Sequence, residues 1–164
     1  KFQPEFKLHI VNFTPTQLEI YDKASESYAI TLMRRYMVRI SEKRGEQVKC
    51  KVLVSGESLG QVASQTMESI DVINRAVGMP IFRPLIGMDK NEIIKISKKI
   101  GTYDISILPF QDCCTIFDPK NPITKPKIDK VLKFEEKIEV DKWVDLSLSD
   151  IEIVKISIQK DDFF

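Results

Sequence analysis

The stretch that decides the fold is residues 48–66, VKCKVLVSGESLGQVASQT, in which an apolar, β-branched run meets a small polar loop. Residues 48–55 predict a buried strand that Gly56 ends. A helix is expected to follow over residues 59–77, with a glycine and a proline just beyond it. A strand that passes through a glycine loop into a helix is half of a β-α-β unit, so this stretch predicts an α/β fold.

The segments around this stretch repeat the alternation of strand and helix. Residues 7–13 predict a partly buried strand, and Thr14, as an N-cap followed by a proline, predicts a helix that reaches about residue 25. Apolar residues three and four apart predict a second helix over residues 29–43. Another short apolar run follows at residues 81–86. Strands and helices that alternate in this way predict a largely parallel sheet.

The second half of the chain begins with strong local signals and then becomes irregular. Asp89 and Glu92 form a capping box for the helix NEIIKISKKI, and Gly101 is its expected C-cap. A proline-rich segment follows, which is long for a loop in a compact domain and indicates a functional or loosely held segment. Residues 129–144 predict a helix, whereas residues 150–159 alternate imperfectly and leave strand and helix open.

Composition limits the classes of function only weakly. The chain has 164 residues, of which 43% are hydrophobic, so one domain with a real core is expected. Its 25 basic residues balance 24 acidic ones, so net charge favours neither a nucleic acid nor a membrane as partner. The absence of a long apolar run and of a signal sequence predicts a soluble, cytoplasmic protein without membrane contact. Three cysteines, an odd number, favour reduced thiols over a disulfide framework.

Several polar residues near the quoted loop are candidates for ligand binding. Gly56 would let the backbone approach a ligand closely at the end of its strand, although a simple tight turn needs a glycine equally. Gln61 and Gln65 would share one helix face and could read a base edge, or could simply face solvent. Arg34 and Arg35 are adjacent on a helix, where one could aim at a phosphate while the other is solvated.

The adjacent pair Cys113 and Cys114 has no easy structural explanation. A disulfide between neighbours is strained, and a zinc site needs wider spacing and further ligands, whereas His9 is the only histidine. No metal site is therefore predicted. A sulfur-carrying thiol and two small buried residues remain equally open, since the neighbouring Asp112 would raise a thiol pKa. Cys50, inside the predicted strand, is expected in the core.

Taken together, five stretches resemble one family. They are MRR at 33–35, SGESLGQVASQT at 55–66, RPLIGMDKNEIIKIS at 83–97, GTYDISILPFQDCCTIFDP at 101–119 and NPITKP at 121–126. In this order they are similar to the ThiI family of sulfurtransferases, which make 4-thiouridine in tRNA and serve thiamine biosynthesis. The resemblance covers roughly residues 6–135. It implies the PP-loop fold, also called adenine-nucleotide α-hydrolase-like.

The resemblance also implies a reaction and a set of residues. In the family, ATP with Mg²⁺ adenylylates uridine 8 of tRNA, and persulfide sulfur from a cysteine desulfurase then displaces AMP. By similarity, Arg34, Gly56 and Gln65 fall on nucleotide-contacting positions. Cys113 falls on the catalytic cysteine, and Cys114 is given at most a supporting role. The resemblance leaves open whether Cys113 carries a persulfide or resolves a disulfide.

The sequence departs from the family in one large respect. The phosphate-gripping motif S-G-G-x-D-S is absent, and neither a THUMP domain nor a rhodanese-like domain is evident. The resemblance therefore implies the C-terminal part of a PP-loop domain, truncated on its N-terminal side, over residues 1–128, with residues 129–164 as an extension packing on it. An incomplete sheet would leave an exposed edge, which a homodimer would cover.

The partners implied are tRNA and a cysteine desulfurase. A basic surface for tRNA is expected to include Arg35, Arg39, Lys120, Lys125, Lys127 and Lys130. Two alternatives are kept. One is a non-catalytic short form of the same domain that binds RNA or protein, and the other is a PP-loop domain acting on another substrate.

Overall fold

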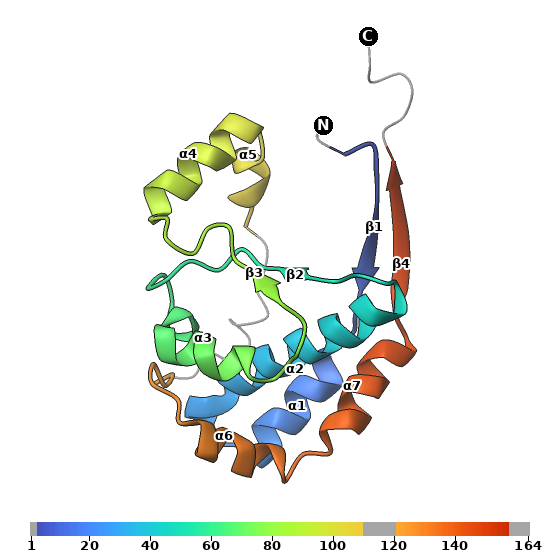
Figure 1. Cartoon of the computed structure of the whole chain (residues 1–164), viewed down its shortest axis with the longest axis vertical. Coiled ribbons are helices and arrows are strands. Elements are labelled where there is room, and N and C mark those ends of the chain that lie inside the picture. Colours follow the sequence, from blue (N-terminus) through green and yellow to red (C-terminus); the bar gives the residue numbers. More distant parts are fainter. Residues whose placement is uncertain (1–2, 110–120, 158–164) are drawn as a thin grey trace.

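The computed structural model describes residues 3–109 and 121–157. Figure 1 shows a layer of helices at the base, two separate pairs of strands above it, and a helical pair that stands apart. In chain order the elements are β1 (Glu5–Ile10), α1 (Thr14–Lys23), α2 (Glu26–Gln47), β2 (Leu53–Val54), the 3-10 turn η1 (Ala63–Gln65), α3 (Met67–Asn74), β3 (Ile81–Phe82), α4 (Lys90–Ile100), α5 (Tyr103–Ser106), α6 (Ile128–Glu135), α7 (Val140–Ser149) and β4 (Glu152–Ser157).

The predicted β-α-β unit is present. β2 and β3 pair in parallel, with Leu53 opposite Ile81 and Val54 opposite Phe82, and α3 lies between them in the chain. The predicted strand over residues 48–55 is wrong in length, because only two of its residues are in a strand. A run of β-branched residues becomes a strand only where a neighbouring strand accepts its hydrogen bonds, and among the described residues β3 is the partner of β2.

The two ends of the described chain meet in the second pair of strands. β1 and β4 are antiparallel, with Phe6 opposite Ile156 and Leu8 opposite Val154. The segment over residues 150–159, for which the sequence left strand and helix open, therefore contains a strand, β4. β1 confirms a strand near residues 7–13, and its apolar side chains are covered only in part, since Phe6 is 44% and Leu8 43% exposed.

The core lies between the helices at the base in Figure 1. α2 is at its centre and contributes Leu32 and Tyr36, both fully buried, against Ile20 of α1. The predicted helix over residues 129–144 is instead two helices, α6 and α7. Ile138, in the link between them, is 2% exposed and packs into this core, so the chain turns inward without a glycine or proline to signal the turn.

The region after the glycine loop is less helical than predicted. Gly60 adopts a left-handed φ of 76°, which ends regular structure there, and α3 begins only after Thr66, whose side chain accepts the amide hydrogen of Ser69. Gln61 and Gln65 therefore do not share one helix face. Cys50 is exposed, so its expected place in the core is also wrong.

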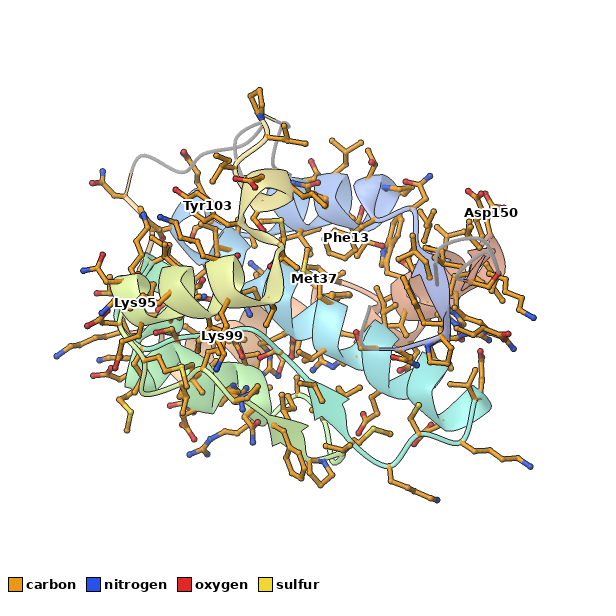
Figure 2. All side chains as sticks on the ribbon, turned by 90° about the horizontal axis from the view of Figure 1, so that it is seen from above. Phe13, Met37, Lys95, Lys99, Tyr103 and Asp150 are labelled. Carbon is orange, nitrogen blue, oxygen red and sulfur yellow. The ribbon has the colours of Figure 1, made fainter. Side chains whose placement is uncertain are left out.

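The capping signals of α4 are confirmed in detail. The Asp89 side chain accepts the backbone amide hydrogen of Glu92, and the Glu92 side chain accepts that of Asp89. Gly101 ends the helix in the left-handed conformation, with φ 72°. No residue of α4 is buried. Seen from above in Figure 2, Lys95 and Tyr103 lie on the α4–α5 pair, on the opposite side of the molecule from Asp150.

Candidate functional site

A buried carboxylate, that of Glu57, is the centre of the candidate site. It lies three residues after the end of β2 and is 4% exposed. Its Oε1 accepts a hydrogen bond from Nη2 of Arg34 on α2 at 2.5 Å. Its Oε2 accepts from Nε of Arg83, just after β3, at 2.7 Å, and from the hydroxyl of Ser55 at 2.7 Å. The carboxyl ends of two parallel strands and a side chain from within α2 thus meet at Glu57, at the edge of the sheet where α/β folds place their ligands.

The electrostatics of this cluster favour an anion. Burial by itself would raise the pKa of Glu57, but the Ser55 hydroxyl and the Arg34 and Arg83 guanidinium groups together hold this pKa below its ordinary value. Glu57 is therefore ionised at neutral pH. Two guanidinium charges against one carboxylate leave an excess of one positive charge in a largely buried place.

The structure links two of the predicted nucleotide residues through Glu57. Gly56 lies between Ser55 and Glu57 in the chain, and the Glu57 carboxylate accepts hydrogen bonds from Ser55 and from Arg34. A Cβ built on Gly56 would meet nothing within 4 Å, so the space over this glycine is open. Close approach of a ligand to the backbone is therefore sterically free here.

Gln65 closes the loop that follows Gly56. Its carbonyl oxygen accepts the amide hydrogen of Gly60 at 2.9 Å, which folds the loop back on itself. Among the described residues, Oε1 of Gln65 has no hydrogen bond to Arg34 or Gly56. Cys113 and Cys114 lie outside the described residues, so their predicted role stays a prediction.

Three buried polar atoms in this region have no hydrogen-bond partner within the described part of the chain. They are Nε of Arg34, Nη2 of Arg83 and Oε1 of Gln65. Buried polar groups are nearly always paired, so such atoms indicate a missing partner. Two donors and one acceptor match what a nucleotide offers, since its phosphates accept hydrogen bonds and its base both donates and accepts.

An apolar groove of about 640 Å³ adjoins the cluster. Val54 and Phe82 of the parallel strands form one part, Met67 and Ile70 of α3 another, and Arg83 is its charged member. A concave apolar surface with a charged group is typical of a small-molecule site.

Two predicted RNA contacts are engaged within the protein. Arg35 is 1% exposed and pairs with Glu135, so the prediction for it is wrong. Arg39, whose side chain is 19% exposed, donates to the same carboxylate. Lys120 lies outside the described residues, whereas Lys125 and Lys127 are exposed.

Sequence reasoning missed two members of the cluster, Glu57 and Arg83. A signal was present, because Glu57 follows Gly56 at the end of a predicted strand and Arg83 is the charged residue within the next apolar run, residues 81–86. The residues described by the structure contain no group of three or more side chains arranged to hold a metal ion. None of the helices in the described ranges is long and apolar enough to span a bilayer.

The fold and the site thus define an α/β protein with a candidate nucleotide site at the ends of its parallel strands. Comparison with known proteins gives the family. Residues 1–140 match the family model described as "Thiamine biosynthesis protein (ThiI)". The chain belongs to the ThiI family, as the sequence predicted.

Relatives of this chain agree on one activity. It is 55% identical over 145 residues to the protein of Thermoanaerobacter pseudethanolicus named "Probable tRNA sulfurtransferase", covering 88% of this chain and 38% of that protein. A protein of the same name from Brevibacillus brevis is 52% identical over 151 residues, 92% of this chain and 38% of its own length. The chain thus spans less than half of these relatives.

A solved structure confirms the fold. It is a crystal structure of a 4-thiouridine synthetase in complex with RNA and bound ATP. The TM-score is 0.88 at 38% sequence identity, over 93% of this chain and 40% of that one. The α/β PP-loop class is therefore established for this chain.

Proposed function

We propose that this chain is the nucleotide-holding part of a tRNA sulfurtransferase. In this reaction ATP, with Mg²⁺, would transfer its adenylyl group to the C4 oxygen of uridine 8 of tRNA and release pyrophosphate. Persulfide sulfur would then displace AMP, and a thiol would supply the two electrons that release this sulfur as 4-thiouridine. The observation that supports the proposal best is the cluster of Arg34, Glu57 and Arg83 beside the open space over Gly56. It offers an excess positive charge and unpartnered donors where a nucleotide phosphate would lie.

ATP would supply the adenylyl group that activates the uridine, and the residues of this chain would bind and orient the nucleotide. Arg34 would hold a phosphate or ribose oxygen through its free Nε. The backbone at Gly56 would approach the nucleotide, and Oε1 of Gln65 would accept a hydrogen bond from it. The motif S-G-G-x-D-S, absent from this chain, would supply the remaining phosphate contacts.

The sulfur step is assigned to Cys113, with the persulfide sulfur coming from a cysteine desulfurase. The chain beyond this cysteine returns to the nucleotide loop, because the Thr66 hydroxyl donates to the carbonyl oxygen of Thr124 at 2.5 Å. This contact joins the segment after Cys113 to the start of α3. Since the matching family is described as a thiamine biosynthesis protein, the proposal extends to sulfur transfer for the thiamine thiazole.

The proposed tRNA surface is narrower than the sequence indicated. With Arg35 buried and Arg39 paired with Glu135, Lys125, Lys127 and Lys130 remain as exposed candidates near α6. Replacing each by glutamine should lower the salt dependence of tRNA binding by about one unit of slope for each phosphate that is no longer neutralised. An unchanged slope in the triple variant would place the tRNA elsewhere.

The nucleotide part is tested by calorimetric titration with Mg-ATP. This chain is compared with one extended upstream through an S-G-G-x-D-S strand and loop. Binding by the extended chain alone is expected, because this chain would then hold only part of the site. Equal binding by both would favour a short form that works without that loop, and binding by neither would contradict the proposal.

The sulfur part is tested with Cys113→Ser in the complete gene product. Thiolated tRNA is measured by its retarded migration in a mercury-containing gel. Loss of the retarded band is expected, whereas Cys50→Ser, at an exposed position away from the cluster, should keep it. Full thiolation by Cys113→Ser would refute the role of this cysteine.

A further inference from the structure

The two arginines on Glu57 each leave a donor unused. Arg34 reaches the carboxylate through Nη2, and its buried Nε has no partner among the described residues. Arg83 reaches it through Nε, and its buried Nη2 is likewise unpartnered within that part of the chain. A guanidinium group with a purely structural role is expected to form hydrogen bonds with all its buried N–H donors, since a buried donor without a partner costs free energy.

A second buried arginine in the same molecule shows the contrast. Arg35 places Nε and Nη2 on the two oxygens of Glu135 at 2.8 and 2.9 Å, and Nη1 on the carbonyl oxygen of Val72. All three nitrogens of this guanidinium are therefore paired. The unpaired donors of Arg34 and Arg83 are thus a property of the site and not of buried arginines in this fold.

Glu57 fixes the direction of both guanidinium groups. Its two oxygens are divided between them, Oε1 for Arg34 and Oε2 for Arg83, while Ser55 donates to Oε2 as well. Because Glu57 is 4% exposed, water competes little for these bonds. The carboxylate is thereby able to hold two arginines, one from α2 and one from the end of β3, at a fixed separation.

The position of Arg83 indicates the class of ligand. It borders the apolar groove formed by Val54, Phe82 and α3, and it belongs to a cluster with one excess positive charge. A ligand that matches both features carries a flat, weakly polar part and an anionic part. A nucleotide with its phosphates has this composition, and planar guanidinium groups suit phosphate oxygens.

We infer that Arg83 is a second nucleotide-binding arginine beside Arg34, and that Glu57 is the positioning residue that orients both toward the phosphates. This inference rests on the proposed function. Glu57 itself touches no phosphate, because a carboxylate would repel it. Its effect on the nucleotide passes through the two guanidinium groups.

The test uses the complete gene product and isothermal titration with Mg-ATP, and separately with adenosine, which lacks phosphates. Arg83→Gln and Glu57→Gln should each weaken ATP binding about tenfold to a hundredfold, since each variant removes charge-assisted hydrogen bonds. Adenosine binding should change less than about threefold. Arg83→Lys, which keeps the charge without the planar group, should lie between wild type and Arg83→Gln.

Controls separate this inference from the proposed function and from loss of folding. Arg75→Gln removes an exposed arginine paired with Asp71 on the same α3 region and should leave ATP binding unchanged. Each variant is checked by its thermal melting curve, and Arg83→Lys remains informative if Glu57→Gln does not fold. If wild type binds ATP but Arg83→Gln and Arg83→Lys bind it equally well, the inference is overturned and the proposed function stands. If wild type binds no ATP, both fail.

Discussion

Arg35 of α2 and Glu135 of α6 are 100 residues apart in the chain, yet they form a buried two-pronged ion pair with distances of 2.8 and 2.9 Å. Arg39 donates to the same carboxylate at 2.5 and 3.0 Å. Because Arg35 also donates to the carbonyl oxygen of Val72, one side chain joins α2, α3 and α6. This cluster connects the C-terminal helices to the element that supplies Arg34.

Removing the Glu135 charge should destabilise the chain strongly. Glu135→Gln leaves Arg35 buried without a counter-ion, so the free energy of unfolding should fall by about 3–5 kcal/mol, as measured by urea denaturation. The control is Asp71→Asn, which breaks the exposed ion pair with Arg75 and should cost less than about 1 kcal/mol. Similar small losses in both variants would show that the buried pair contributes little.

The same carboxylate should make stability depend on pH. Burial would raise the pKa of Glu135, but the guanidinium groups of Arg35 and Arg39 outweigh this and lower it. A pKa that is lower in the folded than in the unfolded state adds stability above the unfolded value, about 4.3 for glutamate, and this is lost as pH falls through the folded value. The free energy of unfolding should therefore fall on acidification. Glu135→Gln should flatten this dependence, and an equal slope would contradict the assignment.

The capping box of α4 should affect that helix alone. Asp89→Ala removes the side chain that accepts the amide hydrogens of Asn91 and Glu92, at a cost of about 1 kcal/mol. Since no residue of α4 is buried, faster hydrogen exchange should be confined to α4 and its neighbour α5. Glu92→Gln, which can still bond the Asp89 amide, should show a smaller effect. A comparable increase in exchange across α2 would refute this local role.

How far the sequence predicts this structure depends on how local each signal is. Both ends of α4 were predicted correctly. Asp89 and Glu92 encode its start and Gly101 its end, and each of these residues lies within one turn of the end that it marks. The length of β2 depends on which strand lies beside it, which residues 48–55 do not specify. The burial of Arg35 depends on Glu135, far along the chain, so helix periodicity alone favoured solvent.

The candidate site shows the same difference between local signals and contacts between distant segments. Arg34, Gly56 and Gln65 were found through resemblance to a family, and the structure joins Arg34 to Glu57, the residue after Gly56. The ion pair of Glu57 with Arg83 required the parallel pairing of β2 and β3, which brings the residues after the two strands together. Pattern reasoning treats each side chain on its own element and therefore did not detect a pair formed between two elements.

Cys50 should react with a thiol reagent in the folded chain. It is exposed in the loop before β2, in place of the core position that the sequence favoured. Iodoacetamide should therefore modify it under native conditions, as read by peptide mass spectrometry. Cys50→Ser should remove that labelled peptide and leave the melting temperature nearly unchanged. Labelling only after addition of denaturant would show that the thiol is protected.

The hydrogen bond between Thr66 and Thr124 should control the segment that follows Cys113. The Thr66 hydroxyl donates to the Thr124 carbonyl oxygen, accepts the amide hydrogen of Ser69 and lies 2.9 Å from the Ser69 hydroxyl, so Thr66→Val removes these hydrogen bonds with little change in shape. A loss of about 1–3 kcal/mol is expected from the groups left unpaired. Faster hydrogen exchange at Ile123, whose amide donates to the Ser27 carbonyl oxygen, would report the release of this segment.

The same variant distinguishes anchoring from nucleotide binding. Under the proposed function, Thr66→Val in the complete gene product should slow tRNA thiolation several-fold and leave the affinity for ATP nearly unchanged, because Arg34 and Glu57 are untouched. Thr66→Ser, which keeps the hydroxyl, should restore the rate. If thiolation and ATP affinity fell together, Thr66 would act on the nucleotide loop itself, and its bond to Thr124 would have no separate role in sulfur transfer.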